Sequence, residues 1–77
     1  MKREEATELM FNEMDRVRAK YQRPYASAHE FYGVLMEEIE ELWEEIKKKE
    51  EVYDIEAQRK EAIQIGSVIL RFIEELT

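Results

Sequence analysis

The chain has 77 residues, a net charge of −7 at pH 7 and no cysteine. This length allows one domain with a small core, and the lack of cysteine excludes disulfides and thiolate metal sites. The negative charge argues against a nucleic-acid polymer as partner, because its phosphates would be repelled. A free nucleotide is not excluded, since bound cations can bridge acidic side chains and phosphate.

The N-terminus favours an intracellular protein. It becomes acidic at Glu4 and Glu5 and lacks the apolar stretch of a signal peptide. The longest apolar region, residues 62–70, is interrupted by Gln64 and Ser67 and is too short to span a bilayer. We therefore expect a cytoplasmic protein with no membrane partner.

Helix-forming residues fill nearly the whole chain, which contains one proline and two glycines, so the chain is predicted to be all-α. The first predicted helix runs from about residue 4 to 20. Its apolar residues at helical spacing are Ala6, Met10, Met14, Val17 and Tyr21. We expect it to end before Pro24, because the residue preceding a proline is pushed out of helical geometry.

Capping residues mark the two later helices. Ser27 and Glu30 form a predicted capping box at the start of the second helix, which extends to about Lys49. Its apolar stripe consists of Phe31, Leu35, Ile39, Leu42 and Ile46. Asp54 is the predicted N-cap of a last helix that runs to about Leu76. The side chains of this helix that we expect to point inward are those of Ala62, Ile65, Ile69, Phe72, Ile73 and Leu76. The chain is thus predicted to form a single three-helix bundle domain spanning residues 1–77.

Both later helices carry a second apolar patch. Ile63 and Leu70 lie on the side of the last helix away from Ile65 and Phe72, and the second helix has a similar patch of Tyr32, Met36 and Trp43. A helix that is apolar nearly all round requires burial on two sides. We therefore expect a homo-oligomer, a dimer or a tetramer. The alternative is a monomer with exposed apolar side chains.

Glutamates crowd the second helix, and helical geometry separates them into two groups. At about 100° per residue, Glu38, Glu41 and Glu45 border its apolar stripe on one side. The acids that point close to the opposite side are Glu37, Glu40 and Glu44. On the last helix, Glu61 and Gln64 lie on one flank of the apolar stripe.

Glu38, Glu41 and Glu61 are therefore expected to converge in a groove between antiparallel helices. Clustered carboxylates repel one another unless they are protonated or neutralised by a cation. Mg²⁺ is the expected ion, because it takes hard oxygen ligands from a few carboxylates, water and phosphate. The alternative is three solvated acids that never meet.

The chain from about Ser27 onward resembles the MazG-like all-α nucleotide pyrophosphohydrolases, particularly their short single-module members. The family pattern is EExxE, a spacer, and then ExxD. Glu37, Glu38 and Glu41 match the first half, and Glu61 opens the second. Gln64 stands where the pattern has aspartate. A neutral amide oxygen is a weaker Mg²⁺ ligand than a carboxylate and cannot act as a base.

The resemblance implies a MazG-like oligomer that hydrolyses a nucleoside triphosphate to nucleoside monophosphate and pyrophosphate with Mg²⁺. It makes Glu38, Glu41 and Glu61 metal ligands and Gln64 a weakened ligand position. Either a neighbour such as Glu45 makes up the loss at Gln64, or the site is impaired or serves a different substrate. Glu37 and Glu38 become the candidate catalytic residues, with Glu37 either the base or a residue that supports the ligands from behind. The alternative is a non-catalytic binding or oligomerisation module on the same helical scaffold.

Two further residues have alternative interpretations. His29, the only histidine, is expected to be exposed in the first turn of the second helix, and a contact with phosphate or base is the alternative. Trp43 is expected at a subunit interface, and stacking on a nucleobase is the alternative.

Overall fold

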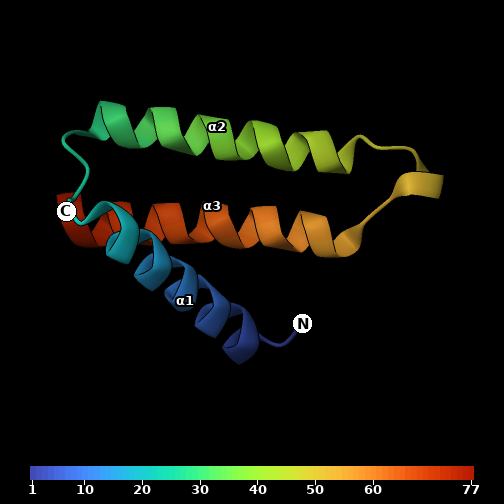
Figure 1. Cartoon of the computed structure of the whole chain (residues 1–77), viewed down its shortest axis with the longest axis horizontal. Helices are drawn as coiled ribbons and strands as arrows, with labels where there is room; N and C mark the ends of the chain where they lie inside the picture. Colours follow the sequence, from blue (N-terminus) through green and yellow to red (C-terminus); the bar gives the residue numbers. More distant parts are fainter.

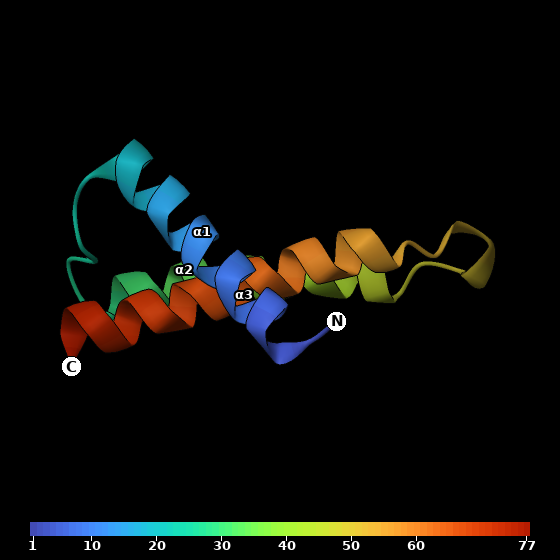
Figure 2. The same ribbon diagram turned by 90° about the horizontal axis from the view of Figure 1, so that it is seen from below.

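The computed structural model describes residues 1–77 and contains no strand. Its helices are α1 (Arg3–Tyr21), α2 (Ala28–Ile46), a single 3-10 turn η1 (Glu50–Val52) and α3 (Ile55–Leu76). The predicted all-α chain of three helices is confirmed. Helices α2 and α3 form an antiparallel hairpin, and α1 crosses α3 obliquely, so that α3 lies between α1 and α2 (Figures 1 and 2). None of these helices combines the length and the apolar character that a membrane span requires.

The helix ends follow from local hydrogen bonds. The predicted cap of α2 is confirmed, because Ser27 Oγ accepts from the Glu30 N–H at 3.1 Å. The Glu30 carboxylate differs from a capping box in that it accepts from the Ala26 N–H. The Asp54 carboxylate caps α3 by accepting from two backbone N–H groups, at 3.0 and 3.1 Å. Helix α1 ends at Tyr21, and the next residue, Gln22, caps it with a left-handed backbone (φ 50°) and an N–H that donates to the Arg18 carbonyl.

The core lies where α1 meets the hairpin. The buried residues are Met14, Tyr25, Ser67, Val68 and Arg71. The Met10 side chain of α1 lies over Gly66 of α3, where an added Cβ would overlap the Met10 sulfur unless that side chain moved. The small core agrees with the expectation for a chain of this length.

The predicted inward face of α3 is only partly correct. Ile65 and Phe72 are half-buried, and the Phe72 ring stacks on Phe31 at 4.2 Å. Ile69 and Ile73, in contrast, are 39% and 52% exposed, and Leu76 is also exposed. The physical reason is the position of α1, which covers α3 on the side of Gly66 and leaves the other edge of the apolar stripe uncovered.

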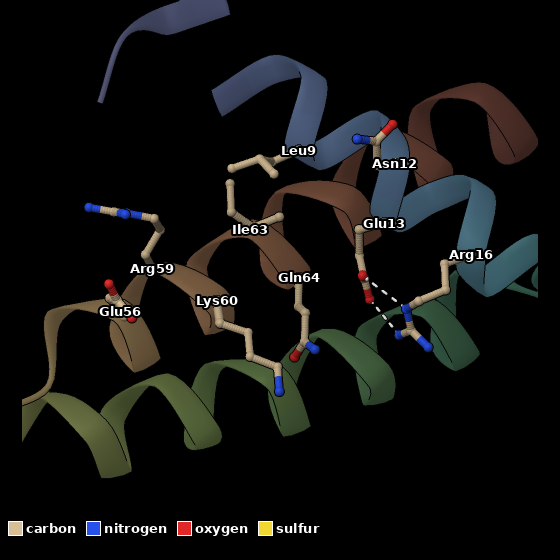
Figure 3. A pocket seen from close by; sticks show the side chains of 9 residues that line it. All are labelled: Leu9, Asn12, Glu13, Arg16, Glu56, Arg59, Lys60, Ile63 and Gln64. Carbon is tan, nitrogen blue, oxygen red and sulfur yellow. Dashed lines mark hydrogen bonds and ion pairs between the residues drawn. The ribbon is translucent and has the colours of Figure 1, made fainter. Parts of the chain in front are cut away.

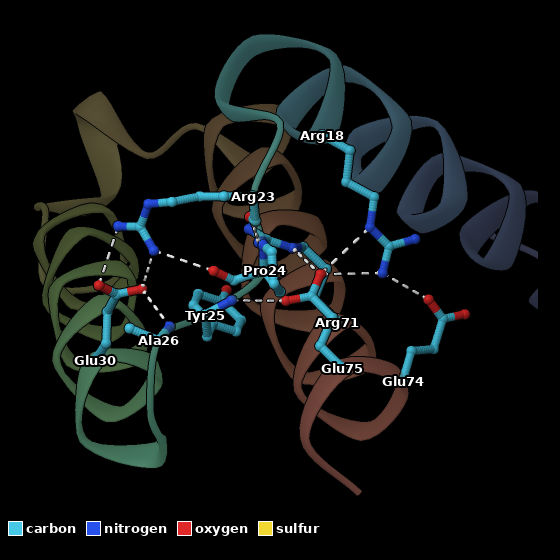
Figure 4. A network of polar contacts seen from close by, with 9 residues as sticks. All are labelled: Arg18, Arg23, Pro24, Tyr25, Ala26, Glu30, Arg71, Glu74 and Glu75. Carbon is cyan, nitrogen blue, oxygen red and sulfur yellow. Dashed lines mark hydrogen bonds and ion pairs between the residues drawn. The ribbon is translucent and has the colours of Figure 1, made fainter.

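A polar clasp joins the α1–α2 loop to the end of α3 (Figure 4). It consists of Arg18, Tyr25, Arg71 and Glu75. The Glu75 carboxylate accepts from the Tyr25 N–H at 2.9 Å, from Arg71 Nε at 3.0 Å and from Arg18 at 3.2 Å. Burial opposes ionisation of Glu75, but these three donors together hold the pKa of its carboxyl below the usual value. The clasp therefore fixes the loop by charge-assisted hydrogen bonds.

Candidate metal centre and adjoining cavities

Three carboxylates from two helices meet on one side of the hairpin. Glu38 and Glu41 come from α2 and Glu61 from α3, and one oxygen of each lies within 4.8 Å of the others. Glu38 and Glu61 are half-buried, whereas Glu41 is exposed. The expected convergence of these acids is present, and we call the three residues the acidic cluster. Their role as metal ligands stays a prediction.

The side-chain amide of Gln64 lies between two of these acids. The amide terminus that faces them is 2.9 Å from Glu38 Oε2 and 3.0 Å from Glu61 Oε2. With the amide nitrogen on this side, Gln64 donates a hydrogen bond to each carboxylate. The sequence prediction considered only the amide oxygen, as a weak ligand, and overlooked the nitrogen as a donor that bridges α2 and α3 without a metal ion.

The same spacing also suits a cation. Neighbouring oxygens around an octahedral Mg²⁺ are about 2.9 Å apart, because each lies about 2.1 Å from the ion. Rotation of the amide by a half turn would present the Gln64 oxygen together with the carboxylate oxygens. Gln64, Glu38 and Glu61 therefore have the spacing of neighbouring ligands around a hard divalent cation, and Glu41 offers a further carboxylate within 4.8 Å of the other two acids.

The acids perturb one another. Burial raises the pKa of Glu38 to about 7, and the nearby charges of Glu41 and Glu61 add to this effect. Burial also raises the pKa of Glu61, with a further contribution from Glu41. Bringing these carboxyls together thus favours their protonated forms. A divalent cation would remove this repulsion and release the protons.

The remaining predicted residues lie outside the acidic cluster. Glu37 is exposed and lines a cavity that Glu38 also lines. Glu45 pairs with Lys48 at 2.8 Å, and its charge adds a smaller contribution to the raised pKa of Glu61. His29 is exposed in the first turn of α2, as expected, and Trp43 is 56% exposed on the hairpin. Stacking of Trp43 on a base stays untested.

Two cavities adjoin the acidic cluster. The outer cavity, of about 590 Å³, lies between α1 and the first half of α3 (Figure 3). Its lining includes the basic residues Arg16, Arg59 and Lys60, and Arg16 is paired with Glu13 at 2.6 Å. The inner cavity, of about 440 Å³, is open to solvent and is lined by residues of all three helices and the α1–α2 loop. Glu13, Arg16 and Gln64 line both cavities, so the Gln64 side of the acidic cluster lies at their junction.

The clasp and the inner cavity were not predicted from the sequence. The Arg71–Glu75 pair has an i,i+4 spacing that signals an ion pair on a helix. Nothing in the pattern indicated that Arg71 would be buried, since arginine is ordinarily exposed. The arrangement depends on the path of the loop through Tyr25, which follows from tertiary contacts.

Comparison with protein-family models, curated proteins and solved structures finds no match to this chain. The resemblance to the MazG-like family therefore depends on the sequence motifs alone.

Proposed function

We propose that this protein is a Mg²⁺-dependent nucleoside triphosphate pyrophosphohydrolase of the MazG-like type, which produces a nucleoside monophosphate and pyrophosphate. The observation that carries the proposal is the meeting of Glu38, Glu41 and Glu61, with the Gln64 amide between two of them at ligand spacing. These side chains would hold the cation at the junction of two cavities large enough for a nucleotide.

The chemistry divides between the ion and the protein. Bound Mg²⁺ would neutralise phosphate charge and lower the pKa of a bound water. Glu38, Glu41 and Glu61 would fix the position of the phosphates by holding the cation. Glu37, on the wall of the inner cavity, would accept a proton from the attacking water. The water oxygen then bonds to phosphorus as the α–β bridge breaks and pyrophosphate leaves.

Gln64 modifies this site. As a ligand, its oxygen contributes no charge, so the cation is held more weakly than by four carboxylates. Without a cation, its nitrogen stabilises the acids through two hydrogen bonds, and Mg²⁺ must displace these bonds. Gln64→Asp is therefore the informative variant. It should increase Mg²⁺ affinity and pyrophosphate release if glutamine limits the site, and it should leave both unchanged if glutamine is fully tolerated.

Pyrophosphate release from a panel of canonical and modified nucleoside triphosphates tests the proposal. Release should require Mg²⁺ and be abolished by Glu38→Gln or Glu61→Gln. Glu40→Gln is the matched control, because Glu40 is an exposed glutamate on α2 outside the acidic cluster. A full panel without turnover, for the wild type and for Gln64→Asp, would contradict the proposal.

A second candidate function is a non-catalytic binding or oligomerisation module. It is favoured by the Gln64 bridge, which supplies hydrogen bonds to Glu38 and Glu61 without a metal ion, and by exposed apolar side chains on the hairpin. Five of these exposed side chains, which we call the open face, are Ile39, Trp43 and Ile46 of α2 and Ile69 and Ile73 of α3. A homo-oligomer, a dimer or a tetramer, would bury it. Assembly that persists when Glu38 and Glu61 are neutralised, together with a lack of saturable Mg²⁺ binding, would support this function over the first.

A further inference from the structure

The side of α2 that faces away from α3 carries exposed apolar side chains. Among the helices, α2 packs on α3 alone, and α1 lies across α3 from it, so no other helix covers this side (Figures 1 and 2). Tyr32 and Trp43 are 61% and 56% exposed, and the half-buried Met36 lies between them in sequence. At about 100° per residue, the three side chains fall within about 40° of one another around the helix axis. Together with Gly33 they form what we call the outer strip, which is about 16 Å long.

Gly33 is a glycine that the chain's own fold does not require. It lies inside α2, where glycine destabilises a helix relative to alanine. Its φ is not positive, and a Cβ at this position would meet no atom within 4 Å. Gly66 differs, because the Met10 side chain lies over it. Backbone conformation and packing within the chain thus leave Gly33 unexplained, whereas a partner that approaches closely would use its bare backbone.

The charge of α2 defines the chemistry of such a partner. The helix contains seven glutamates and neither lysine nor arginine. Glu40 and Glu44 border the outer strip and are exposed, and Glu44 pairs at 2.9 Å with Lys47, just beyond the end of the helix. A second copy that met this side with its own α2 would bring like charges together, which opposes binding. A helix whose apolar stripe is flanked by lysine or arginine complements both the apolar side chains and the acids.

From these observations we infer that the outer strip is a docking site for a basic amphipathic helix of a partner protein. The partner's apolar side chains cover Tyr32 and Trp43, its backbone approaches Gly33, and its cations face the bordering glutamates. This inference is independent of the proposed function, since no residue of the outer strip belongs to the acidic cluster or lines either cavity.

The probe that tests the docking site is a model peptide of about 18 residues, with leucine on one helical face and lysine on the other. Trp43 is the only tryptophan of the chain, so its fluorescence reports on contact with the outer strip. Because Trp43 also belongs to the open face, the protein concentration is kept constant during the titration. We expect a saturable shift of the emission to shorter wavelength and weaker binding at higher salt concentration.

Two control peptides separate docking from general attraction to an acidic protein. One replaces every lysine by glutamate, and the other keeps the leucine and lysine composition in a scrambled order without an apolar stripe. Each should bind about tenfold more weakly than the probe or less, because the first lacks the complementary charge and the second lacks the apolar face.

Gly33→Gln tests the location of the docking site, because it adds a neutral side chain where the inference places the partner's backbone. Without peptide, the variant should melt at a higher temperature than the wild type, since glutamine is the better helix former and the space is open. It should bind the probe about tenfold more weakly. Ala19→Gln, which adds the same side chain at an exposed alanine of α1, is the matched control and should bind like the wild type.

Four results would overturn the inference. The probe would cause no saturable shift, either control peptide would bind as tightly as the probe, or Gly33→Gln would bind the probe like the wild type. In the fourth result, Gly33→Gln without peptide would sediment more nearly as a monomer than the wild type, which would assign the outer strip to a second copy of this chain.

Discussion

The side-chain amide of Gln64 approaches Glu38 Oε2 to 2.9 Å and lies equally close, at 3.0 Å, to Glu61 Oε2. Gln64 thereby connects α2 and α3 at the point where their carboxylates meet. Its nitrogen can bridge the two acids without a metal ion, and its oxygen can join them around one. The balance between these two states determines whether the acidic cluster is a structural contact or a cation site.

Replacing Gln64 by aspartate should shift this balance toward the cation. Gln64→Asp removes two hydrogen bonds and adds a fourth carboxyl, so we expect it to lower the free energy of unfolding without divalent ions by about 1–2 kcal/mol. Mg²⁺ should stabilise the variant more than the wild type. Urea denaturation with and without Mg²⁺ measures both effects. Equal stability of the two proteins in chelator would show that Gln64 does not bridge the acids.

The raised pKa of Glu38 predicts a pH dependence of stability. Between about pH 4.5, the ordinary glutamate value, and about 7, the folded protein holds a proton on Glu38 that the unfolded chain has released. The free energy of unfolding should therefore fall as the pH rises through this interval, by about 1 kcal/mol after allowance for solvent screening. Mg²⁺ binding should strengthen over the same interval, because the cation displaces the proton.

Glu38→Gln provides the control for this pH dependence, because glutamine does not titrate. Unfolding curves of the variant should vary less between pH 4.5 and 7 than those of the wild type. The lowered pKa values of Glu30 and Glu75 act in the opposite sense, since their contribution is lost only as the pH falls below about 4.5. A pH profile of the wild type that matches that of Glu38→Gln would contradict the assignment.

The clasp should contribute far more to stability than a neighbouring surface ion pair. Glu75→Gln leaves Arg71, which is 7% exposed, without a charged partner, and we expect a loss of about 2–3 kcal/mol. Glu74→Gln is the matched control. It removes only the contact of Glu74 with Arg18 at the surface, which is worth at most about 1 kcal/mol. Similar losses in the two variants, measured by chemical denaturation, would show that the clasp is solvated.

The open face predicts self-association. Ile39→Lys and Ile73→Lys place charges on this face and should shift the protein toward the monomer in sedimentation-velocity experiments. Phe11→Lys, at an exposed apolar residue of α1, is the control and should leave the assembly state unchanged. A wild type that sediments as a monomer at high concentration would contradict the prediction.

The sequence predicted some features well for identifiable physical reasons. Helix content, the Ser27 and Asp54 caps and the stop before Pro24 depend on local interactions, so the local pattern determines them. The meeting of Glu38 with Glu61 also followed from helical periodicity, because both acids flank apolar stripes that pack in a hairpin. The direction from which α1 crosses α3 was not predictable in this way. It depends on contacts between distant positions, such as that of Met10 with Gly66.

The candidate site was only partly predicted, because two of its features depend on side-chain positions and on the path of a loop. The Gln64 bridge requires the atomic positions of three side chains, and the inner cavity requires the loop that places Tyr25 against Arg71. Periodicity assigns residues to a helix face but gives neither side-chain orientation nor the path of a loop. The buried Arg71 and its contact with Tyr25 therefore became visible only in the folded chain.

Calorimetric titration of Mg²⁺ into the wild type and Glu61→Gln tests the central claim most directly, since Glu61 is the only member of the acidic cluster contributed by α3. We predict saturable binding to the wild type, with proton release near pH 7, and its loss in the variant. Weak, non-saturating heats that are the same for both proteins would contradict a metal site between α2 and α3.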